Sequence, residues 1–185
     1  MEGRIKIVRV GQLTGDTKNG IWNMSEAWPL MLSTVRELKC LPKIEQELDW
    51  LPFDIAAKAV VDISLADTEP RDLVYHVLNS RGKSSWNDLL RWAQEFEAEK
   101  FEAVEPSVWL KKLEATKDHP AKRLLWLWEE ALQTLEGGKV KRVAFSVENG
   151  AKVSEALKYF QGVDKELVRK IWLWIEEKTA QGKIF

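Results

Sequence analysis

The 185-residue sequence has few of the features that mark secreted or membrane proteins. Its single cysteine, Cys40, excludes an intramolecular disulfide framework and fits a reducing compartment. No apolar run approaches the roughly 18 residues that cross a membrane. The first four residues lead into a strand-like run and not into the apolar stretch of a signal peptide. We therefore expect a cytoplasmic protein that does not contact membranes.

An excess of charge of either sign is also missing. The chain has 28 Lys and Arg against 29 Asp and Glu, a formal net charge of -1. A nucleic-acid binder usually shows a basic excess, and an acidic disordered protein shows the opposite. With 45% hydrophobic residues, the composition is that of an ordinary globular protein without a nucleic-acid partner. We expect one domain over residues 1–185.

The glycines do not form a nucleotide-binding fingerprint. Such a fingerprint needs closely spaced glycines, because the backbone must turn sharply and approach a pyrophosphate at a helix N-terminus. The early glycines Gly11, Gly15 and Gly20 have a different spacing, and no phosphate-binding loop is present. We expect no bound cofactor.

Residue sets for other common chemistries are missing as well. Short-chain dehydrogenases use a Tyr followed four residues later by a Lys, which lowers the pKa of the phenol. Asn follows Tyr75 at that offset, and Val follows Tyr159. The two histidines, His76 and His119, lie far apart in the sequence and far from Cys40, so the sequence predicts no metal site.

Helical signals dominate what is present. Amphipathic stripes and capping residues predict helices over about 25–39, from 54, from 85, from 106, from 120 to the glycines at 137–138, over 151–160 and from 164. Short β-rich runs cover 5–10, 73–78 and 101–104, with a further candidate at 143–147. The expected fold class is α+β, mostly helical. The strand at 5–10 needs a partner from a distant segment, a second copy or another chain.

The unusual feature of the composition is ten Trp against two Tyr and six Phe. Several large side chains cluster in segment 22–53, near the carboxylates Asp16, Glu26, Asp49 and Asp54; they are Trp22, Trp28, Met31, Trp50 and Phe53. These side chains suit a hydrophobic core with helix-cap carboxylates. They also suit a concave apolar site in which a desolvated carboxylate acts as acid or base. The pattern leaves both interpretations open, with the core favoured.

A series of segments, in order, resembles the C-terminal part of the terminal thioester reductase domain of fungal non-ribosomal-peptide-synthetase-like and polyketide synthase enzymes. The similar segments are 7–16 (IVRVGQLTGD), 20–23 (GIWN), 26–31 (EAWPLM), 49–57 (DWLPFDIAA), 75–79 (YHVLN), 85–90 (SWNDLL), 108–110 (VWL), 154–157 (SEAL) and 163–167 (VDKEL). The resemblance extends over nearly the whole chain.

The resemblance implies a role in substrate binding. Such reductases are extended short-chain dehydrogenases that use NADPH to release a carrier-bound acyl thioester as an aldehyde or alcohol. By the family pattern, residues 5–10 would be a late strand of the dinucleotide-binding sheet, Gln12 would lie beside the nicotinamide, and segment 22–53 would line the acyl pocket. The glycine-rich loop and the Tyr/Lys pair of the family are not in this sequence. The resemblance therefore implies the pocket and not hydride transfer.

Three functional hypotheses follow. The first is cofactor-independent cyclisation or condensation of a polyketide-like small molecule, bound by Gln12 and the large side chains named above, with Asp49 and Asp54 as acid–base groups. The second is a partner subunit that docks an acyl carrier protein or completes a split reductase. The third is an inactive fragment of a reductase. We place the substrate-pocket hypothesis first and expect a homodimer that covers exposed apolar faces.

Overall fold

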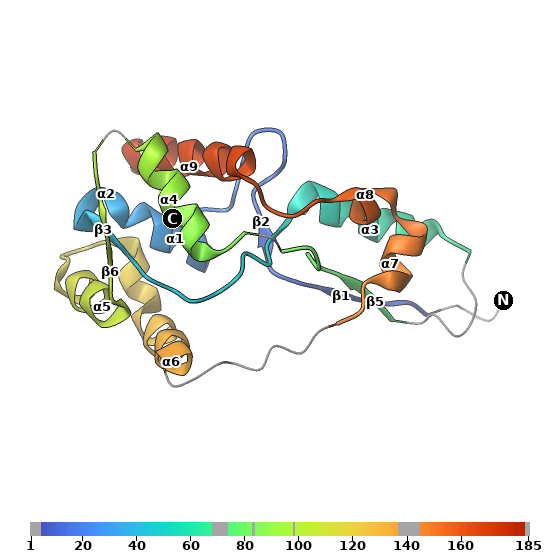
Figure 1. Ribbon diagram of the computed structural model, residues 1–185, viewed down its shortest axis with the longest axis horizontal. Helices are drawn as coiled ribbons and strands as arrows, with labels where there is room; N and C mark the ends of the chain where they lie inside the picture. Colours follow the sequence, from blue (N-terminus) through green and yellow to red (C-terminus); the bar gives the residue numbers. More distant parts are fainter. Residues whose placement is uncertain (1–4, 68–73, 83, 98, 137–144, 184–185) are drawn as a thin grey trace.

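The computed structural model describes residues 5–67, 74–82, 84–97, 99–136 and 145–183 (Figure 1). The helices are α1 (Ala27–Ser33), α2 (Val35–Leu38), α3 (Phe53–Leu65), α4 (Trp86–Phe96), α5 (Pro106–Ala115), the 3-10 helix η1 (Pro120–Leu124), α6 (Leu125–Glu136), α7 (Glu148–Val153), α8 (Glu155–Tyr159) and α9 (Lys165–Ala180). The strands are β1 (Ile7–Val10), β2 (Leu13–Thr14), β3 (Cys40–Pro42), β4 (Leu51–Pro52), β5 (Val74–Val77) and β6 (Glu102–Val104). The mostly helical fold class predicted from the sequence is confirmed.

The strands form three separate parallel pairs: β1 with β5, β2 with β4, and β3 with β6. The strand expected at 5–10 begins at Ile7, and its partner is β5 of the same chain, with Ile7 opposite Val74 and Val10 opposite Val77. The distant-segment alternative is therefore the one that the structure adopts. Strands β2, β3 and β4, of two or three residues each, were not predicted.

The β2–β4 pair lies between two hydrophobic cores. Successive side chains of a strand point to opposite faces. Trp50 accordingly lies in the larger core, whereas Leu51, the next residue, lies in the smaller one, and Leu13 packs against that smaller core. Figure 1 shows the same division: α1, α4, α5, α6 and α9 gather on one side of β2, and α3, α7, α8, β1 and β5 on the other.

Local capping explains where several helices begin. Ser85 and Asp88 form a reciprocal capping box at the start of α4. Pro106 occupies the first turn of α5, and the Asp164 carboxylate accepts a hydrogen bond from the Leu167 amide at the start of α9. These three starts agree with the sequence prediction.

The helix expected over 25–39 divides in two, and its start differs from the prediction. Glu26 and not Ser25 precedes α1, without a side-chain cap. Thr34 separates α1 from α2, because its hydroxyl donates to the Met31 carbonyl and accepts from Trp109 Nε1. Lys39 then ends α2 in the left-handed conformation, with φ 52°.

Other boundaries also differ. The segment from Pro120 begins as a 3-10 helix, and the helix expected over 151–160 is replaced by α7 and α8, which are separated at Ser154. Of the strand expected at 143–147, residues 145–147 are not a strand and the rest lies outside the described residues, as do the glycines at 137–138.

Candidate functional site

A tightly hydrogen-bonded loop, residues 15–21, follows β2. The Asp16 carboxylate accepts backbone hydrogen bonds from Lys18 (2.9 Å), Asn19 (2.7 Å) and Ile21 (2.7 Å). Burial raises the pKa of Asp16, but the backbone donors outweigh it, so that the pKa lies below its ordinary value. Asp16 is therefore an ionised carboxylate that fixes the loop.

The same loop is hydrogen-bonded to the first turn of α3. The Asp54 carboxylate accepts from the Thr17 hydroxyl at 2.6 Å and from the Thr17 amide at 3.2 Å. Asp49 is exposed before β4 and has an interaction partner. Catalysis by Asp49 and Asp54 stays a prediction, and the observed contacts give Asp54 a role in positioning the loop.

Two of the predicted substrate-binding side chains face outward beside this loop. Gln12 is exposed, and its backbone carbonyl accepts from the Leu51 amide at 2.9 Å. Phe53 directly follows β4 and is 43% exposed. Phe53 adjoins the carboxyl end of β4, the end at which open α/β sheets usually bind ligands, whereas Gln12 lies between the end of β1 and the start of β2.

The other predicted substrate-binding residues face inward. Trp22, Met31 and Trp50 are buried in the larger core, with the Trp22 and Trp50 rings 5.0 Å apart. Trp28 is partly buried, and its ring lies 5.4 Å from that of Trp50 and 5.3 Å from that of Trp86. The structure thus brings the tryptophans together as a packed cluster. Their contact with a substrate stays a prediction.

The glycines in and before the loop do not provide a cradle for the pyrophosphate of a dinucleotide. A Cβ atom added at Gly11 would lie 2.8 Å from the Leu78 Cβ, and one at Gly15 would lie 2.5 Å from the Gly20 carbonyl oxygen. At Gly20, which has φ +70°, a Cβ would lie 2.4 Å from the backbone nitrogen of Ile171. Each glycine therefore permits close packing within the protein, and these residues do not fit NADPH phosphates.

Among the described residues, no group of three or more His, Cys, Asp or Glu could hold a metal ion. Cys40 is buried in β3, and burial raises the pKa of its thiol, which disfavours the reactive thiolate.

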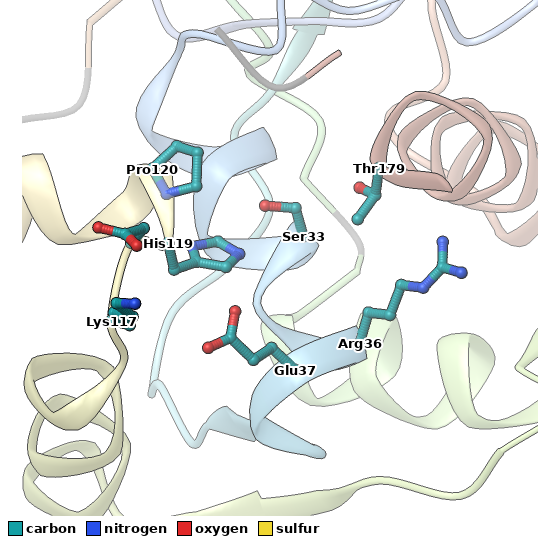
Figure 2. Close-up of a pocket in the computed structure, with 8 residues that line it drawn as sticks. Ser33, Arg36, Glu37, Lys117, His119, Pro120 and Thr179 are labelled. Carbon is teal, nitrogen blue, oxygen red and sulfur yellow. The ribbon is translucent and has the colours of Figure 1, made fainter. Parts of the chain in front are cut away.

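A cavity lies between the end of α1, α2, the α5–η1 connection and the end of α9 (Figure 2). Its volume is about 520 Å³, and its lining includes Ser33, Arg36, His119 and Thr179. His119 Nδ1 accepts from the Ala121 amide at 3.1 Å, and burial lowers the pKa of His119 below its ordinary value. In Figure 2 the Glu37 carboxylate points toward His119, and Arg36 extends toward the helix that carries Thr179. The sequence analysis did not single out this cavity.

Arg36 also lines a second cavity of about 440 Å³, which the sequence analysis likewise missed. Glu97 and Glu176 both line this cavity, where burial and, after it, the neighbouring Glu97 raise the pKa of Glu176 to about 7. A charged run such as 95–100 is typical of a solvated helix face, but Glu97 within it is partly buried and accepts from Trp172 Nε1 at 3.0 Å.

Comparison with known proteins identifies the fold. No family model matches the sequence. The non-reducing polyketide synthase sor2 of Hypocrea jecorina (strain QM6a) is 28% identical over 90% of this chain and 6% of the synthase. The adenylate-forming reductase stbB of Stachybotrys bisbyi is 31% identical over 74% of this chain and 13% of that protein.

Solved structures of reductase (R) domains have a fold similar to that of this chain. The terminal R domain of the myxalamid PKS-NRPS pathway matches with a TM-score of 0.72 and 22% identity, over 94% of this chain and 44% of that one. The reductase (R) domain of a Mycobacterium tuberculosis non-ribosomal peptide synthetase matches with a TM-score of 0.69 and 16% identity, over 92% of this chain and 45% of that one. The chain is related to the reductase (R) domains of polyketide synthases and non-ribosomal peptide synthetases.

The R-domain relationship confirms the resemblance found in the sequence. This R-domain relative spans less than half of the solved R domains and 6% to 13% of the two curated relatives named above. Among its described helices, none combines the length and apolarity needed to cross a bilayer.

Proposed function

We propose that this R-domain relative binds the apolar acyl group of a polyketide- or peptide-derived substrate beside the loop over residues 15–21, which follows β2. The observation that carries the proposal is the exposure of Gln12, just before β2, and of Phe53, just after the paired strand β4, next to a loop that Asp16 and Asp54 hold in place. The half-exposed ring of Phe53 supplies apolar surface for an acyl chain. The side-chain amide of Gln12 can donate a hydrogen bond to the acyl carbonyl of the substrate.

Isothermal titration calorimetry with octanoyl-N-acetylcysteamine, a soluble acyl thioester, tests this proposal. We expect saturable binding that Phe53→Ala weakens by about tenfold, since removing the ring costs roughly 1.4 kcal/mol of contact. Val61→Ala is the matched control, because Val61 is exposed on the same helix, away from its first turn. No binding to the unaltered chain, or equal loss in both variants, would contradict the proposal.

We further propose that the bound substrate is cyclised or condensed without a cofactor. Holding a flexible chain near its reactive conformer lowers the barrier, and Asp49 and Asp54 are the nearby carboxylates for proton transfer. The test is turnover of polyketide-like aldehydes and thioesters, without nucleotide, by the unaltered chain and by Asp49→Asn. Product formation that Asp49→Asn reduces supports this step, and binding without turnover rejects it. Saturable quenching of tryptophan fluorescence by NADPH would instead favour a redox role.

A second candidate function, as a partner subunit, is favoured by the outer edge of β1. Among the described residues β1 pairs only with β5, and Ile5, Ile7 and Val10, on or just before β1, are each about half exposed or more. Parallel sheets are usually covered on both faces, and an open edge offers unpaired backbone groups to another strand. We propose that a second copy of this chain covers this surface.

Light scattering coupled to gel filtration tests the homodimer. We expect twice the monomer mass for the unaltered chain and a monomer for Ile7→Lys, because a charge on the exposed face opposes burial. Lys18→Ile, on the exposed loop, should leave the dimer intact. A monomer at every concentration would reject the homodimer and leave docking to an acyl carrier protein or to the rest of a reductase, which the same method detects when carrier protein is added.

A further inference from the structure

The connection between α5 and η1 ends in a histidine whose side chain caps η1. His119 Nδ1 accepts a hydrogen bond from the Ala121 amide at 3.1 Å, and His119 is only 8% exposed. A ring nitrogen accepts only while it carries no proton, so His119 is neutral in this arrangement and its proton lies on Nε2. Ala121 is fully buried, so its amide depends on His119 for a hydrogen-bond acceptor.

Protonation of His119 disturbs this connection in two ways. Nδ1 becomes a donor, which breaks the bond and leaves the buried Ala121 amide without an acceptor. Protonation also places a charge on a side chain that is largely withdrawn from water. Burial accordingly lowers the pKa of His119 below its ordinary value of 6.5, although the Glu37 carboxylate acts in the opposite direction.

The charged groups that face His119 are balanced in sign. Four exposed charged side chains line the cavity beside it: Arg36 and Glu37 of α2, and Lys117 and Asp118 of the connection. Helix α1 carries no charged residue, and the end of α9 presents Thr179 to the cavity. Lys122 of η1 donates to the Thr116 carbonyl at 2.8 Å. Because the exposed charges oppose one another and water screens them, burial decides which form of His119 is favoured.

We propose that His119 and its bond to Ala121 form an acid-sensitive latch, which holds η1 against α1 at neutral pH and releases it in mild acid. The contact between α1 and η1 is the one that loosens, because the imidazolium is better solvated outside its buried position. Helix α5 stays in place, since Trp109 Nε1 donates to the Thr34 hydroxyl at 3.1 Å and neither group titrates in this range. Release therefore widens the cavity that His119 lines.

The direction of the effect follows from proton linkage. Because the folded pKa of His119 lies below the unfolded value, the unfolded chain binds more protons, and stability is lost as the pH falls below about 6.5. Glu176, whose pKa is raised to about 7, acts in the opposite sense and adds stability as the pH falls. The latch is therefore measured as the difference between two chains that both contain Glu176. It lies apart from Gln12 and Phe53, so its test does not depend on the proposed substrate site.

Thermal unfolding at about pH 7.5 and about pH 5.5 tests the latch. Between these values we expect the Tm of the unaltered chain to fall by about 3 °C more than that of His119→Asn. The Asn side-chain carbonyl can cap the Ala121 amide at both pH values, because it does not titrate. Asp118→Asn is the matched control, since Asp118 is the exposed neighbour of His119, and it should keep the pH dependence of the unaltered chain. Equal falls in the unaltered chain and His119→Asn would overturn the latch.

A direct titration guards against a variant that fails to fold. The chain has two histidines, so His76→Gln assigns both imidazole signals in nitrogen-15 NMR of the histidine-labelled chain. We expect His119 to carry its proton on Nε2 at about pH 7.5 and to titrate below about pH 6.5, with the Ala121 amide signal moving at the same midpoint. A midpoint at or above about pH 6.5, a ring still neutral at about pH 4.5, or an Ala121 amide that does not follow the ring shows that the latch is wrong.

Discussion

The two hydrophobic cores of this chain differ in both content and closure. The larger core gathers buried side chains from α1, α4, α5, α6 and α9 around an aromatic cluster that includes Trp50, Trp86 and Trp109. The smaller core contains seven buried hydrophobic residues beneath β1 and β5, none of them a tryptophan. Its sheet, as far as the described residues go, has two strands, and β1 carries Ile7 and Val10, each 48% exposed.

The difference shows which of the residues predicted to bind substrate are open to solvent. The aromatic segment that suggested a pocket is closed by its own packing, with Trp22, Met31 and Trp50 almost fully buried. The outward-facing residues, Gln12 and Phe53, lie on the β2–β4 boundary next to the smaller core. Tryptophan content therefore marks the stable part of this chain, and the exposed surfaces proposed for function belong to the less complete part.

The largest effect should come from the centre of the aromatic cluster. Trp86 is fully buried, its indole donates to the Pro42 carbonyl at 2.7 Å, and its ring lies 5.3 Å from that of Trp28. Replacing it with Ala should lower the free energy of unfolding by about 3–5 kcal/mol, because a cavity remains and the carbonyl loses its donor.

Denaturant unfolding measures this change, and Trp126→Ala is its control. Trp126 is 63% exposed, so its loss should cost less than about 0.5 kcal/mol. Similar costs for both variants would mean that the aromatic cluster does not stabilise the larger core, and the contrast between the two cores would fail.

The next effect should arise where the loop over residues 15–21 meets α9. Gly20 has φ +70°, and a Cβ there would lie 2.4 Å from backbone atoms of Lys170 and Ile171. Gly20→Ala should therefore lower the free energy of unfolding by about 1–3 kcal/mol through backbone strain and displacement of α9. Gly182 also has a positive φ, +65°, but nothing lies within 4 Å of an added Cβ. In thermal unfolding Gly182→Ala should cost less, and the reverse order would contradict this packing.

A smaller effect is expected at the start of α4, which lines the larger core. The Ser85 hydroxyl accepts from the Asp88 amide, and Asp88 accepts from the Ser85 amide at 2.9 Å. Ser85→Ala should cost about 1 kcal/mol in urea unfolding, whereas Ser107→Ala, on the exposed first turn of α5, should be near neutral. An unchanged unfolding midpoint for Ser85→Ala would show that tertiary packing alone fixes this helix.

The smallest effect should appear in the smaller core. The Tyr75 hydroxyl is buried and has no hydrogen-bond partner among the described residues. Tyr75→Phe removes this unsatisfied group and keeps the ring, so the free energy of unfolding should stay the same or rise by up to about 1 kcal/mol. A loss above about 1 kcal/mol by calorimetry would show that the hydroxyl has a partner, and Tyr159→Phe on the exposed face of α8 provides the neutral comparison.

Local signals allowed much of the fold to be predicted from the sequence. The capping residues at Ser85 and Asp164 and the proline at Pro106 act within one helical turn, and each marks an observed helix start. The β-rich runs likewise predicted β1, β5 and β6. The pairing of β1 with β5 could not be predicted, because it joins residues more than 60 positions apart through backbone groups that every residue carries.

The candidate site was harder to predict, for two physical reasons. Segment 22–53 contains both Trp50, which is buried, and Phe53, which is exposed, and the two-residue strand β4 between them leaves too little pattern to tell the faces apart. The partial burial of Glu97 depends on the packing of α4 against α9, and a charged run alone does not reveal which carboxylate is covered.

The most direct test of where substrate binds is an NMR titration of the nitrogen-15-labelled chain with octanoyl-N-acetylcysteamine. We predict shifts concentrated at the amides of Gln12, Thr17 and Phe53, with the indole signals of Trp22 and Trp50 unmoved, because those rings are closed in the larger core. Shifts of the two indole signals with Gln12 and Phe53 unmoved would contradict this account, since the aromatic segment would then be an open pocket.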